Sequence, residues 1–535
     1  MRVTNQMVTN SSLRNMQKSM QRVGNLNEQV TTGKKISAPS QDPVVAIRAL
    51  KLRTTCDQLD QYKKKNIPDA LSWLDTTQTS IQNVFNRLDD VYDYCEQGAS
   101  DTYQTKDRST IINELYALKD AIYAEGGTTY AGRYLFSGYK TETNLIFQNE
   151  EAKQGLSYNI TENINPASIE PKSVVLNEVN AEQLDSILAN PNAYESPVSE
   201  DVYRMRLSYD DLDNTDTGTV MNVTNKDGTV NEVVVPTISI TITDANGDEN
   251  TITIPQLDPN VPNDPPVVMK QIADSATYYD VDPNGINYIP ETGEIIFGET
   301  LYNSTIKSAQ DISVSYYKSE FDVGDLRPEM YFDCTQYKSM PDGTIDSTEF
   351  TVNPAGQPIQ YEVNFNQYIT VNAEGKDLIT HDMGNKIEDL AIAVQDVLDI
   401  EHTITRLKEL LEDPQYKNNE AAVEQINKML SDADVELALK RENMQKLFGK
   451  NMSNFQAFME DVSAVQAKVG TTYSKLELIQ VRVTEQVANF EELKSSNEDI
   501  ETEEVAIELY QAELVYESAL STTAGVIKKT LLDYL

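Results

Sequence analysis

The chain has 535 residues and a formal net charge of −41, because 85 Asp and Glu residues outnumber 44 Lys and Arg residues. This excess of negative charge argues against binding to nucleic acid or to anionic membranes, since both would repel the chain. With two histidines and three cysteines that form no CxxC pair, the sequence offers little for a catalytic triad, a metal site or a disulfide framework. We therefore expect a protein that is not an enzyme and holds no cofactor or metal.

Long apolar runs are missing from the sequence. The first twenty residues contain none, and nowhere do about 18 apolar residues follow one another. This pattern predicts neither a cleaved secretory signal peptide nor insertion into a membrane. A function outside the cell would then require an export route that does not use a cleaved signal.

The N-terminal part shows the period of an amphipathic helix. Apolar residues recur every three or four positions from Leu13 to Val30, and again from Ile67 to Tyr92. Between these runs stands a TGKKI segment at residues 32–36, which we interpret as a turn and not as a phosphate loop, because no GxxxxGK[ST] pattern is present. Asp42 followed by Pro43 predicts the start of the next helix.

A GRYLFSG segment occupies residues 132–138. Its Tyr134 and Phe136 stand between glycines, so they belong either to a loop packed on the helices or to a contact between subunits. The residue pattern favours the packed loop and leaves the second reading open.

The middle of the chain differs in composition from both ends. It holds 16 of the 20 prolines, between Pro166 and Pro358, and residues 201–380 carry 30 acidic but only 9 basic side chains. Alternating apolar and polar residues at 237–243, followed by Asn246-Gly247 and a second alternating run at 251–254, predict a β-hairpin. Asp244, Asn246 and Asp248 lack the glutamate that would complete a calcium loop, so a β-turn is the better interpretation.

The C-terminal half contains the most regular stripe, which runs from Val462 to Leu493 in steps of three and four residues. It includes Val483, Val487 and Phe490. Such a narrow stripe is typical of a coiled coil, and one helix cannot bury it without a partner. The two ends also differ in charge, with a net +8 for residues 1–65 and a net −6 for residues 499–535. The ends are therefore either separately solvated or attracted to each other.

These patterns predict a mainly α protein with a β-rich insertion. We expect a long antiparallel coiled-coil bundle formed by the N- and C-terminal segments, with the insertion between them. Residues 1–40 and 499–535 would form terminal arms of an inner assembly domain. Residues 41–154 and 381–498 would form the helical bundle, and residues 155–380 an acidic, surface-exposed β-rich domain, which could comprise two subdomains.

Several of these motifs stand in the order seen in a known family. Leu26-Asn27, the TGKKI segment and Asp42-Pro43 resemble the N-terminal signature of the flagellin superfamily, and residues 495–509 with the chain end resemble its second arm. The opening residues 2–7 and the 132–138 segment resemble the branch of that superfamily found at the junction between flagellar hook and filament. The resemblance covers about residues 1–150 and 385–535 and leaves the middle unexplained.

The resemblance implies an extracellular structural subunit of the bacterial flagellum, exported by the flagellar type III apparatus. It implies a ring of identical subunits, another hook-associated protein on the hook side, flagellin on the distal side, and a cytosolic export chaperone. The residues expected at assembly interfaces are Leu26, Asn27, Gly33, Ile36, Asp42, Tyr134, Phe136, Val483, Val487, Phe490, Leu509, Leu531 and Leu535.

Other functions stay open at this stage. The chain could be flagellin itself, the subunit of the filament. The central domain could instead be a surface module that binds a glycan or a receptor. A wall-degrading enzyme is the least favoured alternative, because the sequence contains no nucleophile motif and no metal-ligand spacing.

Overall fold

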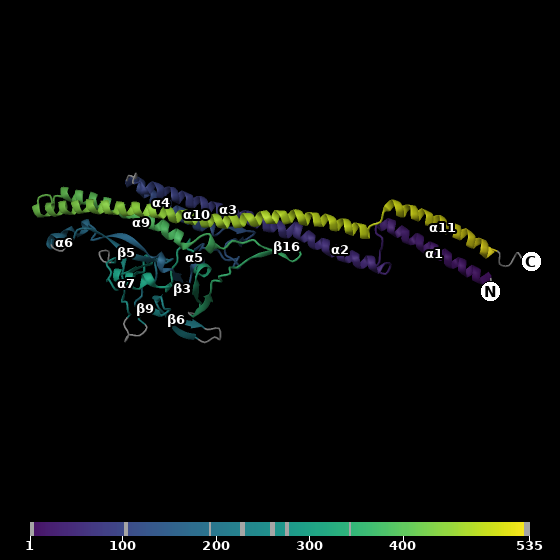
Figure 1. Cartoon of the computed structure of the whole chain (residues 1–535), viewed down its shortest axis with the longest axis horizontal. Coiled ribbons are helices and arrows are strands. Elements are labelled where there is room, and N and C mark those ends of the chain that lie inside the picture. The colour runs from purple at the N-terminus through teal and green to yellow at the C-terminus, as the bar shows by residue number, and fades with distance from the viewer. Residues whose placement is uncertain are drawn as a thin grey trace, which may run out of the picture. The chain divides into compact units, whose positions relative to one another are not determined.

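The computed structural model of the chain describes residues 5–100, 105–191, 194–224, 230–256, 263–272, 278–341 and 344–528. Within these residues the chain forms long helices at both ends and a β-rich region in the middle (Figure 1). This arrangement confirms the predicted fold class. Among the described helices, none combines the length and the apolar character needed to cross a membrane.

The helical ends contain the longest elements of the chain. In order they are α1 (Asn5–Thr32), α2 (Pro43–Gln61), the π-helix η1 (Tyr62–Asn66), α3 (Ile67–Ala99), α4 (Thr105–Glu125), α9 (His381–Glu412), α10 (Glu420–Glu498) and α11 (Thr502–Lys528). Gly126 and Gly127 follow α4 directly, as expected for a helix stop. Asp413 follows the last residue of α9 and opens a turn, and α10 begins only at Glu420.

The paired helices run antiparallel to each other, as the order of their contacts shows. In the α4–α9 pair, Arg108 bonds to Glu401 and Lys119 to Glu388, so the contact moves backwards along α9 as α4 advances. In the α3–α10 pair, Gln82 accepts from Gln466 at 2.7 Å, and Gly98 faces the ring of Phe448. The antiparallel order is thus present in the contacts, while the coiled-coil supercoil itself remains a prediction.

Two β-sheets form the middle of the chain. The first has the order β7 (Val230–Val235), β6 (Thr219–Thr224), β15 (Ile345–Phe350), β14 (Asp333–Ser339), β3 (Leu156–Ile164), β13 (Asp311–Lys318), β8 (Ile238–Thr243) and β9 (Glu249–Ile254). The second has the order β10 (Val267–Met269), β11 (Ile286–Ile289), β12 (Glu294–Phe297), β5 (Val198–Arg206) and β4 (Glu170–Leu176). The pairs β15–β6 and β10–β11 are parallel, and the other pairs in these two sheets are antiparallel.

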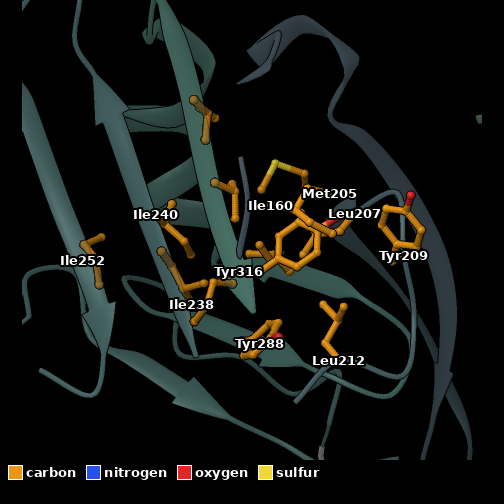
Figure 2. Packing of buried hydrophobic residues seen from close by; sticks show 14 of the residues in the cluster. Ile160, Met205, Leu207, Tyr209, Leu212, Ile238, Ile240, Ile252, Tyr288 and Tyr316 are labelled. Atoms are coloured by element: carbon orange, nitrogen blue, oxygen red, sulfur yellow. The ribbon is translucent and has the colours of Figure 1, made fainter. Parts of the chain in front are cut away.

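The two sheets share one hydrophobic core. Alternate residues of β8, namely Ile238, Ile240 and Ile242, point inwards, which is the period-two pattern of a half-buried strand. They pack with Tyr316 of β13 and with Tyr288 of the second sheet (Figure 2). The predicted hairpin is present, since β8 pairs with β9 and Asp244 accepts from the backbone amides of Asn246 and Asp248 at 2.7 and 2.9 Å.

Smaller elements complete the middle region. They are the short pair β1 (Thr129–Tyr130) and β2 (Arg133–Tyr134), the helices α5 (Glu150–Lys153), α6 (Leu184–Ala189), α7 (Glu299–Ser304) and α8 (Pro328–Tyr331), and the hairpin β16 (Gln360–Asn364) and β17 (Gln367–Thr370). The brevity of these helices agrees with the high proline content of the region.

The chain divides into two compact units. Unit 1 comprises residues 1–72, 360–370 and 472–535, and unit 2 comprises residues 73–359 and 371–471. Unit 1 therefore joins the first and the last segments of the chain with the β16–β17 hairpin, and unit 2 contains both β-sheets. These two units do not test the predicted division into three domains, which stays a prediction.

Candidate assembly surface

Four charged side chains join the first and last parts of unit 1. Lys34 Nζ lies 2.5 Å from Asp499 Oδ1 and 3.4 Å from Glu498 Oε2. Arg53 on α2 donates from Nε to Glu498 Oε1 at 2.7 Å and from Nη2 to Glu498 Oε2 at 2.6 Å. We call these four residues, Lys34, Arg53, Glu498 and Asp499, the clasp. It links segments more than 440 positions apart in sequence.

The backbone reinforces the clasp. Lys34 and Asp499 form an isolated antiparallel β-bridge. Lys35 N donates to Glu498 O at 2.7 Å, and Ile500 N donates to Gly33 O at 3.1 Å. Gly33 has a φ of +69°, a conformation that favours glycine, so the glycine of the TGKKI segment allows the chain to leave α1 and pair with the C-terminal segment.

The charge states of the clasp support each other. The hydrogen bond from Arg53, followed by other effects of Arg53 and Lys34, keeps the pKa of Glu498 below its ordinary value. The hydrogen bond from Lys34 lowers the pKa of Asp499, and the same bond raises the pKa of Lys34. All members are therefore charged near neutral pH, although Glu498 is only 4% exposed. A buried carboxylate requires such partners, because an unpaired one would be costly.

Asp42 begins α2 as its sequence position predicts. Its Oδ1 accepts from the amides of Val44 at 2.9 Å and Val45 at 3.1 Å, and Pro43 occupies the first turn. Asp42 is thus an N-cap residue that fixes the direction in which α2 departs. Ile36 lies half-buried in the connection before it.

Helices α1 and α11 pair within unit 1, with Arg22 of α1 3.7 Å from Glu508 of α11 (Figure 1). Leu26 is buried at 6% exposure, Leu509 is half-buried, and Asn27 is exposed. The basic N-terminal end and the acidic C-terminal end thus form ion pairs in two places, between α1 and α11 and in the clasp.

Large apolar side chains remain exposed on the helices of unit 1. Such exposure is unusual when it recurs on one element, and it often marks a surface that another protein covers. Among these residues we consider Val44, Ile47 and Leu50 on α2, Leu478 and Val481 on α10, and Ile507, Tyr510, Leu514, Val515 and Leu520 on α11. We call this set the exposed apolar surface.

The C-terminal stripe is buried in part. Val483 and Val487 are 0% and 4% exposed, and Phe490 is half-buried. Leu493 is 54% exposed, so the expectation that the buried stripe extends to this residue is wrong. Beyond the stripe, the end of α10 is held by the ion pair between Arg53 and Glu498.

The two aromatic residues of the 132–138 segment lie in different surroundings within unit 2. Phe136 is 1% exposed, and its carbonyl accepts from Gly375 N at 2.8 Å, which agrees with a packed loop. Tyr134 is half-buried and donates to Gln148 Oε1 at 3.3 Å. Leu531 and Leu535 lie outside the described residues.

Arg53 and Glu498 were not among the residues expected at interfaces. The one signal in the sequence was the opposite net charge of the two ends, which cannot single out a pair of residues. Among the described residues, no group of three or more His, Cys, Asp and Glu side chains is arranged to hold a metal ion.

Residues 3–141 match the family model described as the bacterial flagellin N-terminal helical region. The N-terminal part of the chain is therefore similar to the helical region of flagellins. The match includes the TGKKI segment and Asp42, whose roles at the clasp and at the start of α2 are described above. Flagellins are structural proteins and not enzymes, so this match agrees with the prediction that the chain is not an enzyme.

Individual relatives agree with this assignment. The chain shares 27% identity over 199 residues with flagellar hook-associated protein 3 of Escherichia coli strain K12, which is 36% of this chain and 59% of the relative. It shares 25% identity over 167 residues with a flagellin of Clostridium tyrobutyricum, which is 31% of this chain and 43% of the relative. The chain thus spans less than two thirds of the length of these relatives.

Solved structures of similar proteins include hook-associated protein 3 of Legionella pneumophila. Its identity to this chain is 11%, with 83% of this chain and 97% of that chain covered and a TM-score of 0.29.

Proposed function

We propose that the chain is an extracellular structural subunit of the bacterial flagellum that forms a ring at the junction between hook and filament. In this proposal one face of the ring meets another hook-associated protein, and the other face seats the first flagellin subunits. The observation that carries the proposal is the clasp together with the exposed apolar surface. The clasp holds the two ends of the chain together, and the exposed apolar surface offers contact area for neighbouring copies.

The physical requirements of a junction fit this arrangement. A ring subunit needs a fixed geometry between its two ends, because small angular errors repeated around a ring prevent closure. Bidentate pairing of Arg53 with Glu498 gives directional bonds of this kind. The apolar residues on α2 and α11 then supply surface that is stable only when another chain covers it.

The assembly roles of individual residues follow the same logic. We propose that residues 1–40 and 499–535 act as the inner assembly arms, with Leu26, Asn27, Gly33, Ile36 and Leu509 placing them. Residues 41–154 and 381–498 act as the supporting bundle through Asp42, Val483, Val487 and Phe490. Residues 155–380 act as the outer domain. Tyr134 belongs to the segment of the bundle that precedes the outer domain in sequence.

Export is the remaining part of the proposal. The subunit leaves the cell through the flagellar type III apparatus, and a cytosolic chaperone holds its C-terminal segment before export. Exposed apolar residues of α11, such as Ile507, Tyr510 and Leu514, are a suitable target for such a chaperone. Leu531 and Leu535 belong to the same segment by sequence.

Complementation tests the proposal. A strain that lacks the gene should produce hooks without filaments, and the intact chain should restore filaments and motility. A chain without residues 499–535 should not restore them. Labelled copies should appear as a single band between hook and filament. Label along the whole filament would instead identify the chain as flagellin, the alternative that the match to a flagellin favours.

A further inference from the structure

The β16–β17 hairpin of unit 1 is held firmly along one side. Glu362 accepts from Tyr62 OH at 2.9 Å through its carboxylate and from Asn66 Nδ2 at 2.8 Å through its carbonyl, which fixes the hairpin to η1. Tyr361 OH donates to Asp69 on α3. The inward residues of the hairpin include Val363 and Ile369, which are 0% and 4% exposed.

The hairpin also contacts α10. Arg482 Nη2 donates to Gln367 Oε1 at 2.5 Å, and Asn364 Nδ2 donates to Gln486 Oε1 at 3.2 Å. Arg482 and Gln486 are one helical turn apart, so the hairpin lies along one face of α10. Bonds to both η1 and α10 leave the hairpin little freedom to move.

Beside these bonds the hairpin carries exposed aromatic rings, and Tyr368 is the cross-strand partner of Glu362. Tyr368 is 57% exposed and Phe365 is 42% exposed, although Phe365 also makes an edge contact with Tyr62 at 5.7 Å between ring centroids. Leu478 lies one turn before Arg482 on α10 and is 74% exposed. Rigid aromatic groups lose little conformational entropy on binding, which makes them common anchors in interfaces.

Basic residues of η1 stand next in sequence to the residues that hold the hairpin. Tyr62 and Asn66, which hold the hairpin, are separated by Lys63, Lys64 and Lys65 of η1. Lys64 pairs with Asp60, while Lys63 and Lys65 flank the residues bonded to Glu362. An interruption of an α-helix by a π-helical turn often occurs at functional positions. Here it contains three consecutive lysines between the two residues that hold the hairpin, in a chain of net charge −41.

We propose that Phe365, Tyr368 and Leu478, together with Lys63 and Lys65 of η1, form a contact surface for an acidic surface of a second copy of this chain. The inference rests on the proposed function, since it requires copies to assemble side by side. Charge selects this occupant, because copies with a net charge of −41 repel one another unless a basic surface faces an acidic one. In this arrangement the hairpin of one subunit binds to the surface of the neighbouring subunit.

Site-specific photocrosslinking tests the inference in intact flagella. Benzoylphenylalanine replaces Tyr368, which preserves an aromatic side chain, and in a control strain it replaces Tyr139 of unit 2, which is 62% exposed. We expect a covalent dimer of this chain from position 368 at a yield at least ten times that from position 139. The double variant Lys63→Glu/Lys65→Glu in the same background should reduce the dimer yield at least five-fold.

The outcomes separate the two proposals. Protein located at the junction that crosslinks from position 368 to a different flagellar protein, or not at all, would overturn the inference and leave the proposed function intact. Absence of the protein from flagella, with no defect in filament growth when the gene is deleted, would overturn both. A dimer yield unchanged by the two glutamates would remove the role of charge and refute the inference as stated.

Discussion

Arg53 on α2 and Glu498 at the end of α10 form a two-bond salt bridge, at 2.7 and 2.6 Å, between positions 445 residues apart in sequence. Glu498 also contacts Lys34, so one buried carboxylate connects three segments of unit 1. This geometry explains the structural role of the TGKKI segment. It lets the chain turn at Gly33 and presents Lys34 to the acidic C-terminal segment.

Replacing Glu498 by Gln should loosen the connection between the two ends of the chain. The neutral amide loses the charge that attracts Arg53 and Lys34, and we expect a loss of about 1–2 kcal/mol from the free energy that holds the segments together. Limited proteolysis between residues 33 and 42 should become several times faster. As a control, Lys446→Ala breaks an exposed pair with Glu442 and should change neither proteolysis nor unfolding measurably. Equal proteolysis of both variants would contradict a structural role for the clasp.

The clasp should also respond to pH in a defined direction. The pKa values of Glu498 and Asp499 are lowered in the folded chain, so their contribution to stability is present at neutral pH and is lost as the pH falls through the folded pKa values. The pKa of Lys34 is raised, so its contribution is lost only in strongly alkaline solution. Amide hydrogen exchange at Lys35 and Ile500, corrected for intrinsic rates, should therefore accelerate as the pH falls below about 4. Protection that does not depend on pH would rule out ionic stabilisation here.

A buried ionic cluster in unit 2 offers a test of stability. Arg204 on β5 donates to both oxygens of Asp389 at 3.0 and 2.5 Å and to Glu294 at 2.6 Å, and these three side chains are at most 11% exposed. Arg204→Met leaves two buried carboxylates without this partner and should lower the free energy of unfolding by about 3–5 kcal/mol at pH 7. Urea unfolding of the variant measures this loss. Arg406→Met removes only an exposed pair with Glu409 and serves as the control.

The same variant should show a smaller defect in acid. Nearby cations hold the pKa of Asp389 well below its usual range, and that of Glu294 at about 2, against the opposing effect of burial. Without Arg204 these carboxyl groups should take up protons at higher pH, which relieves their buried charge. The difference between variant and wild type should thus shrink from pH 7 to pH 4, and a constant difference would exclude buried charge as its cause.

Two valines that lie close together in sequence on α10 differ in burial, so they test the effect of burial alone. Val483 is 0% exposed and Val481 is 59% exposed. Val483→Asp places a carboxylate in the apolar seam and should cost about 3 kcal/mol or more, whereas Val481→Asp should remain within about 0.5 kcal/mol of the wild type. Thermal unfolding followed by circular dichroism compares the two. Similar destabilisation by both substitutions would contradict the burial of this stripe.

Two glycines make a second matched pair. A Cβ atom at Gly98 of α3 would overlap the ring of Phe448 of α10, while at Gly470 of α10 it would meet nothing within 4 Å. Gly98→Ala should therefore destabilise unit 2 by about 1–3 kcal/mol. Gly470→Ala should stabilise the helix by about 0.5–1 kcal/mol, because alanine has the higher helix propensity. A stabilising effect at Gly98 would show that α3 and α10 do not pack this closely.

The sequence alone was sufficient for local structure, because local structure follows from periodicity and from residues of restricted conformation. Asp42-Pro43 predicts the start of α2 and the alternating run at 237–243 the strand β8, and both are present. The family resemblance could likewise be read from short motifs. The extent of the buried stripe could not, since Leu493 has the same spacing as Val483 but lies exposed.

Only the tertiary structure decided which distant residues meet. Arg53 and Glu498 carry no distinguishing pattern in sequence, because any of the 44 basic side chains could pair with any of the 85 acidic ones. Their pairing depends on the register in which α2 lies beside the end of α10. The same holds for Tyr368, whose exposure depends on the bonds that hold the hairpin to η1 and α10. Periodicity determines which face of an element is apolar, whereas long-range packing determines whether that face is covered.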